Sequence, residues 1–293
     1  MKHKLPSIPL LLSVLVLSSG CYAKGDVPVL EGPYLGQKPP GLTPEPFALG
    51  IVTTKGWEVG ARFSRDMDAF YFLRKRHDNE ETESVIYQQK DNRWHETITQ
   101  GRTRLPFYSP DGEVVHLGKQ YKERTKSGWS EVKDLGSPYK QIPIMSLTAS
   151  NKGTYVFDEA TRDGNGVLRY SSLINGQREA PKPLDKAINT GKWNAHPYIA
   201  PDESYILWDS EREGGYGDND LYVSFKSQDG SWGKAINFGD KINTDAQEFG
   251  PMITPDGKYL FFSRNMGPIA GQKSANVDTF WVDAQFIKDL KTK

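Results

Sequence analysis

The chain has 293 residues, of which 37 are Lys or Arg and 37 are Asp or Glu, so the formal net charge at pH 7 is zero. This balance gives no net field that would attract a polyanion, and we expect no nucleic-acid partner. Apolar residues make up 37% of the chain and aromatic residues 12%, which is enough for an extensive core. The 28 glycines and 19 prolines favour many short strands joined by turns.

The N-terminus has the pattern of a secretory signal peptide. Basic residues open the chain, an apolar run extends from Leu5 to Leu17, and small residues follow it. The only cysteine, Cys21, comes after Ser-Ser-Gly, which resembles a bacterial lipoprotein cleavage box whose thiol is lipidated. The alternative is ordinary cleavage after Ala23. We therefore expect residues 1–23 to be a signal and lipidation region, and the protein to be exported as a periplasmic protein or an outer-membrane lipoprotein.

A short turn motif recurs along the chain. Ser-Pro-Asp-Gly at Ser109 returns as Ala-Pro-Asp-Glu at Ala200 and as Thr-Pro-Asp-Gly at Thr254, with weaker copies at Ser64 and Ser150. Proline fixes φ and aspartate bonds its neighbouring backbone, so each copy favours a tight turn. Self-similarity at a period of 40 to 55 residues is typical of repeat folds.

Each turn is followed by an aromatic and branched run that predicts a strand, such as Tyr205–Trp208 or Tyr259–Phe262. Third strands and short fourth strands follow, for example Leu221–Val223 and Ala235–Phe238. Four strands per repeat match one blade of a β-propeller. The sequence predicts an all-β propeller with five four-stranded blades, or six if a degenerate copy is present.

The last repeat lacks its fourth strand. Val52-Thr53-Thr54 aligns without gaps to Ile188-Asn189-Thr190 and Ile242-Asn243-Thr244, so we expect this N-terminal strand to complete the last blade and close the ring. Residues 24–45 are then an extended tether, and residues 46–293 form a single propeller domain, which we expect to be a monomer.

The run Pro255-Asp256-Gly257-Lys258-Tyr259-Leu260-Phe261-Phe262-Ser263 resembles the TolB-type, WD40-like propeller repeat of bacterial envelope proteins. The resemblance extends over residues 46 to 283. It implies an envelope location and contact with an envelope protein or a glycan, with the membrane reached through a lipid anchor on Cys21. It implies no single chemistry, because propellers host many functions.

The loops opposite the Pro-Asp-Gly turns surround the channel mouth and are the default binding face. They carry an arginine at one position in four repeats, which predicts a cationic ring for carboxylate or phosphate groups, joined by Glu58 and Glu248. The alternative is that each arginine pairs with an acid of a neighbouring blade. The four arginines are Arg76, Arg162, Arg212 and Arg264.

Two functions follow from this face. The first is a non-enzymatic binding or scaffolding propeller of the cell envelope. The alternative is a carbohydrate-active enzyme, hydrolase or lyase, that uses Glu58, His196 and Glu248. We expect no cofactor and no metal-ligand cluster; the segments Gly214–Asp220 and Asp163–Gly166 leave calcium as an alternative.

Overall fold

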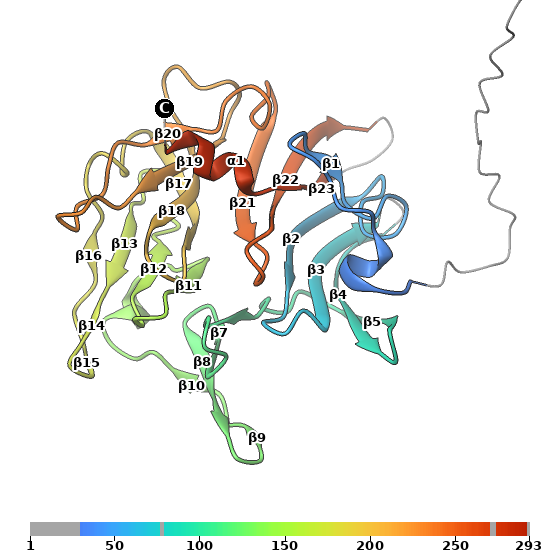
Figure 1. Ribbon diagram of the computed structural model, residues 1–293, viewed down its shortest axis with the longest axis horizontal. Helices are drawn as coiled ribbons and strands as arrows, with labels where there is room; N and C mark the ends of the chain where they lie inside the picture. The colour runs from blue at the N-terminus through green and yellow to red at the C-terminus, as the bar shows by residue number, and fades with distance from the viewer. Residues whose placement is uncertain (1–29, 77–78, 270–273, 292–293) are drawn as a thin grey trace, which may run out of the picture.

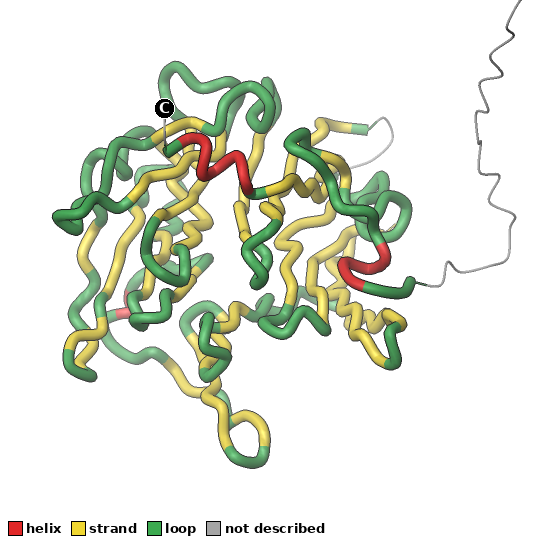
Figure 2. Tube along the Cα trace, in the orientation of Figure 1, coloured by secondary structure: helices red, strands yellow, loops and turns green. Residues whose placement is uncertain are grey.

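The computed structural model describes residues 30–76, 79–269 and 274–291; the signal region with Cys21 and the first part of the expected tether lie outside them. Strands dominate, and the helices in the described part are η1 (Pro33–Gly36), η2 (Tyr139–Gln141) and α1 (Gln285–Leu290), as Figure 2 shows. In these residues, none of the helices has the length and apolar character that crossing a bilayer requires. The all-β prediction is confirmed.

The strands form five groups of antiparallel neighbours, which follow the repeats along the chain (Figure 1). One parallel pairing, of Trp57 with Val277, joins the first and fifth groups into an eight-stranded sheet. The first group contains β2 (Trp57–Phe63), β3 (Ala69–Arg76), β4 (Asn79–Lys90) and β5 (Arg93–Gln100). The second contains β6 (Phe107–Tyr108), β7 (Val114–Leu117), β8 (Gln120–Thr125), β9 (Gly128–Trp129) and β10 (Lys133–Asp134).

The third group contains β11 (Leu147–Ala149), β12 (Tyr155–Asp158), β13 (Leu168–Ser171) and β16 (Lys182–Pro183), with a hairpin of β14 (Leu173–Ile174) and β15 (Gln177–Arg178) beside it. The fourth contains β17 (Lys192–Ile199), β18 (Tyr205–Glu211), β19 (Asp220–Phe225) and β20 (Ile236–Asn237). The fifth contains β21 (Gln247–Ile253), β22 (Tyr259–Pro268), β23 (Ala275–Asp283) and β1 (Glu45–Pro46).

The N-terminal strand of the chain joins the last group, but the strand that does so is not the predicted one. β1 pairs with β23, with Glu45 opposite Trp281, whereas residues 51–54 form a turn in which Thr53 bridges to Leu49. The prediction that Val52-Thr53-Thr54 forms the closing strand is wrong, because these residues form the turn that precedes the first strand of their repeat. From this turn, the Thr53 hydroxyl donates to Thr279 O at 2.8 Å.

The N-terminal segment also packs into the core, so its described part is not an extended tether. Tyr34 and Leu35 of η1 are buried, and Phe47 is fully buried at the junction of the first and fifth groups. The Phe47 ring lies 5.1 Å from that of Phe70 and 4.8 Å from that of Phe261, centroid to centroid. Aromatic pairs of this kind stabilise a fold by about 1 kcal/mol each beyond their area burial.

The first strands of three groups share one irregularity that shapes the channel. Register shifts lie between Val59 and Arg62 in β2, between Ala195 and Tyr198 in β17, and between Phe249 and Met252 in β21. A bulge adds a residue, bends the strand and redirects a side chain, and bulges are common beside binding sites. The same position in three repeats therefore turns its side chains toward the axis of the molecule.

Candidate functional site: a cationic cavity at the channel mouth

Two cavities lie along the central axis, one toward each face. The first, of about 560 Å³, is lined by residues from the beginning of all five first strands, and the second, of about 450 Å³, is lined by the Pro-Asp turns. Arg62, Phe107 and Met252 line both cavities and form a septum between them. The first cavity is thus at the face that the sequence predicts for binding.

The wall of the first cavity is cationic. It carries three arginines, Arg62, Arg102 and Arg104, together with His116 and His196, and no Asp or Glu is among its lining residues in the described chain. Burial lowers the pKa of His116 to about 4, so this ring is uncharged at pH 7. Among the side chains described in residues 30–76, 81–269 and 274–291, no carboxylate forms an ion pair with any of the three guanidinium groups. Unpaired arginines in a concave site favour carboxylate or phosphate ligands.

Arg62 is the deepest of the three, at the septum. Its Nε donates to Gly60 O at 3.0 Å, while Arg102 and Arg104 are exposed at the mouth. Burial lowers the pKa of the Arg62 guanidinium to about 10, which leaves it charged at pH 7. A partly buried charge without a counter-ion is costly, and an anionic ligand would remove that cost.

His196 presents its ring to the same cavity and is held from behind by a buried carboxylate. His196 Nδ1 lies 2.8 Å from Oδ1 of Asp209, and the side chain of Asp209 is fully buried. Asp209 also accepts Gly250 N at 3.0 Å and Asn219 Nδ2 at 3.1 Å. Burial opposes the charged imidazole, but the charge and hydrogen bond of Asp209 outweigh burial and raise the pKa of His196. Asp209 therefore favours the positively charged form of the His196 imidazole at the cavity wall.

The backbone of His196 marks it as unusual. Its φ is +46°, and the repeats align His196 with Gly60 and Gly250, whose φ values are +73° and +68°. A left-handed conformation suits glycine and strains a residue with a Cβ. Such strain persists where the surrounding contacts impose it and is concentrated at functional sites. The backbone N–H of His196 is fixed as well, by Asp158 Oδ2 at 3.1 Å.

The two predicted acids do not reach the cavity. Glu58 and Glu248 are fully buried, and each accepts hydrogen bonds from the N–H and hydroxyl of the threonine four residues earlier, Thr54 or Thr244. Glu248 also accepts Arg264 Nε at 2.6 Å. The glycosidase pair of Glu58 and Glu248 is wrong, because neither carboxylate lines the cavity. Of the three predicted catalytic residues, only His196 is in place.

The predicted arginine ring is wrong as well, because none of its four members is among the cavity-lining residues of the described chain. Arg264 bonds Glu248 within its own blade and lies 4.5 Å from the centroid of Phe280. Arg212 donates to Ile188 O and lies over Tyr222, and Arg162 is exposed on a loop. These arginines anchor strands and loops inside their repeats, so pairing between blades is not their role either.

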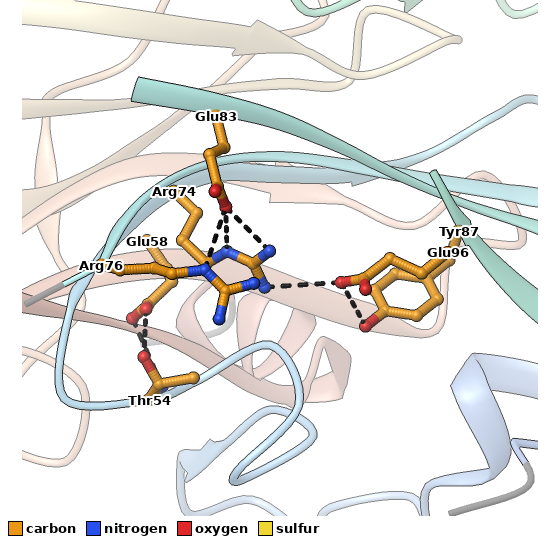
Figure 3. A network of polar contacts seen from close by, with 7 residues as sticks. All are labelled: Thr54, Glu58, Arg74, Arg76, Glu83, Tyr87 and Glu96. Atoms are coloured by element: carbon orange, nitrogen blue, oxygen red, sulfur yellow. Dashed lines mark hydrogen bonds and ion pairs between the residues drawn. The ribbon is translucent and has the colours of Figure 1, made fainter. Parts of the chain in front are cut away.

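Arg76 belongs to a buried ion-pair network in the first group (Figure 3). Its Nε lies 3.3 Å from Glu83 Oε2, which also accepts Arg74 Nε at 2.9 Å. Arg74 extends to Glu96, whose Oε1 accepts the Tyr87 hydroxyl at 2.9 Å. Figure 3 shows Glu58 beside this network and hydrogen-bonded to Thr54. Burial raises the pKa of Glu58 to about 7, and the hydrogen bonds from Thr54 only partly oppose this rise.

The remaining candidates are structural. The turn aspartates cap their own turns, as where Asp111 accepts Glu113 N at 3.0 Å. In the two loops considered for calcium, Asp220 accepts Tyr216 N at 2.8 Å and Asp163 accepts Asn165 N at 3.1 Å. No group of three His, Cys, Asp or Glu side chains in the described residues is arranged to hold a metal ion.

Sequence reasoning missed the arginines that do line the cavity. Arg62 turns inward because of the bulge at Gly60, and Arg102 and Arg104 come from the connection between the first two groups. A signal was available for His196, since it replaces the glycine that the aligned repeats carry. The aligned repeats have Gly60 and Gly250 at the position of His196.

Comparisons with known proteins leave both the family and the function open. No family model matches the chain, and no curated protein matches it. Among solved structures, TolB from Acinetobacter baumannii is 12% identical with a TM-score of 0.43, covering 78% of this chain and 57% of that one. An α-L-arabinofuranosidase catalytic domain from Coprinopsis cinerea is 9% identical with a TM-score of 0.49, covering 83% and 97%. The propeller domain of the Pyrococcus furiosus Trilobed protease is 14% identical with a TM-score of 0.33, covering 79% and 70%. This chain aligns with little more than half of TolB. The all-β propeller fold rests on the repeats and on the strand pairing of the chain itself.

Proposed function

We propose that the protein is a binding propeller that holds a ligand bearing a carboxylate or phosphate group in the 560 Å³ cavity at its channel mouth. The observation that carries this proposal is the wall itself, with Arg62, Arg102 and Arg104 unpaired and no acid opposite them in the described chain. His196, whose positively charged form Asp209 favours, lines the same cavity in a conformation that its repeat counterparts reserve for glycine.

The test is calorimetric titration of the protein with inorganic phosphate and with galacturonate. Arg62→Gln and Arg104→Gln should each weaken binding about tenfold, the loss of one charge-assisted pair. Arg93→Gln is the matched control, because it removes an arginine that pairs with Glu31 at 2.9 Å and lies outside the cavity. Failure of both anions to bind, or binding that neither cavity variant weakens, contradicts the proposal.

The cellular setting completes the proposal. An envelope protein anchored through an acylated Cys21 would present the cavity to envelope partners or glycans. Intact-mass measurement of the mature protein from membranes tests this part: an acylated Cys21 supports it, and a free N-terminus at Lys24 refutes it.

A second candidate function is a carbohydrate-active enzyme, and one observation favours it. His196 is oriented by a buried aspartate and held in a strained conformation beside the cavity, which suits a group that transfers a proton to a bound substrate. Turnover of acidic oligosaccharides that is abolished in His196→Gln would establish it. Binding without turnover leaves the binding propeller as the function.

A further inference from the structure

Trp193 is a large exposed aromatic residue near the start of the strand that brings His196 to the cavity wall. The residue is 44% exposed, and it lies three residues before His196 in β17. β17 runs from this face toward the second cavity, which Ile199 lines. Trp193 is therefore further out along the same strand than the histidine that lines the first cavity.

The indole lies flat on Gly164. A Cβ placed on Gly164 would meet Trp193 Cε2 at 2.6 Å, Cδ2 at 2.7 Å and Cζ2 at 3.0 Å. Cδ2 and Cε2 form the bond shared by the two indole rings, and an atom equally close to both must lie over the ring plane, since that bond has no outer edge. One face of the indole thus packs on Gly164, and the exposed area belongs to the remainder of the ring system.

The backbone holds this exposed ring at a cost. Trp193 has a φ of +53°, a conformation that strains a bulky residue, and its N–H donates to Gly164 O at 2.7 Å. Because Trp193 is 44% exposed, it gains only part of the burial that would offset the strain. Its repeat counterpart Trp57 is only partly exposed and lines the cavity. Strain at an exposed aromatic residue points to a ligand contact.

The surroundings of the ring are polar and carry charges of both signs. Asp163, next to Gly164, is exposed and bonded by Asn165, and Asn219 donates to Trp193 O at 3.4 Å. Arg162 and Lys192, the neighbours of Asp163 and Trp193 in the chain, are also exposed. Carboxylates accept hydrogen bonds from hydroxyl groups, and amides both donate and accept them. The surroundings of Trp193 therefore suit a hydroxyl-rich ring, and the cavity suits an anion.

We propose that the ligand is an acidic oligosaccharide, whose charged end enters the cavity of Arg62 and His196 while a neighbouring sugar ring stacks on the free face of Trp193. The inference rests on the proposed anion-binding function and names the substrate class. An indole presents a large, rigid apolar face to the flat C–H face of a pyranose at little cost in side-chain entropy. Trp193 is a second contact, which short anions cannot reach.

The experiment is calorimetric titration with galacturonate, trigalacturonate, maltotriose and AMP. Wild type should bind trigalacturonate about tenfold more tightly than galacturonate, and maltotriose weakly. Trp193→Ala should remove that advantage and leave the affinity for galacturonate unchanged. Trp193→Asn should do the same, and since asparagine tolerates a positive φ, this variant separates loss of the platform from loss of folding.

Leu42→Ala, which trims another exposed apolar side chain away from the cavity, is the matched control and should bind every ligand as wild type does. If both Trp193 variants bind trigalacturonate as tightly as wild type does, a sugar ring does not stack on Trp193, while the proposed anion binding is unaffected. Tighter, Trp193-dependent binding of AMP overturns the sugar class in favour of a nucleotide. If neither galacturonate nor phosphate binds wild type, the proposed function itself fails.

Discussion

Asp209 Oδ1 lies 2.8 Å from His196 Nδ1 and 3.0 Å from the backbone nitrogen of Gly250, so one buried carboxylate joins the fourth and fifth strand groups behind the cavity wall. The same contact determines the charge of the imidazole, because burial alone would lower the pKa of His196 and Asp209 raises it. Asp209 therefore influences both the charge of His196 in the cavity wall and the contact between the fourth and fifth groups.

Asp209→Asn should shift the pH dependence of anion binding to lower pH. With the charge of Asp209 gone, burial dominates and the pKa of His196 falls, so the variant loses its imidazolium at a lower pH than wild type does. Galacturonate binding should therefore weaken at a lower pH in the variant than in wild type. Calorimetric titration at a series of pH values measures the difference, and identical pH profiles would show that Asp209 does not control the imidazole.

Glu58→Gln should stabilise the protein above neutral pH. The folded Glu58 has a pKa of about 7 against an ordinary value of 4.5, so the folded chain binds this proton more tightly than the unfolded chain. The free energy of unfolding therefore falls as pH rises from about 4.5 to about 7 and then levels off. Glutamine removes that loss, about 3 kcal/mol at pH 8. Urea unfolding at pH 5 and pH 8 should show a gain at pH 8 only.

Glu248→Gln should do the opposite, although Glu248 is the repeat counterpart of Glu58. It leaves Arg264, whose side chain is 14% exposed, without its carboxylate, and breaking a buried pair costs about 3 kcal/mol. The expected loss is present throughout pH 6 to 8. The double variant Glu248→Gln/Arg264→Met should recover part of it in the same unfolding experiment. A Glu248→Gln variant as stable as wild type would show that the pair contributes nothing.

Leu35→Ala should destabilise the propeller by about 3 kcal/mol, because Leu35 is fully buried and its truncation leaves a cavity. Leu42→Ala, seven residues on and 50% exposed, should change stability by less than about 0.5 kcal/mol. Thermal unfolding of both variants tests whether the N-terminal segment is part of the folded unit. Equal melting temperatures would indicate a tether.

The repeat turns and the buried second strands could be predicted from sequence because their signals are local. Asp256 caps its turn by accepting Thr254 Oγ1 at 2.6 Å, and β18 reads as one apolar run since both of its faces are covered. The cavity could not be predicted in the same way. The inward direction of Arg62 depends on a bulge in its strand. The buried position of Glu248 depends on its pairing with Arg264 on the neighbouring strand. Both features are set by the register of the strands, which composition does not reveal.

The septum of Arg62, Phe107 and Met252 separates the two cavities, and the charged Arg62 side chain is on the wall of both. A ligand that neutralises the Arg62 guanidinium from the channel mouth also changes the electrostatic potential of the chamber beneath the Pro-Asp turns, because the same side chain is on its wall. A ligand bound at the channel mouth would therefore alter the affinity of the second cavity for charged groups through Arg62.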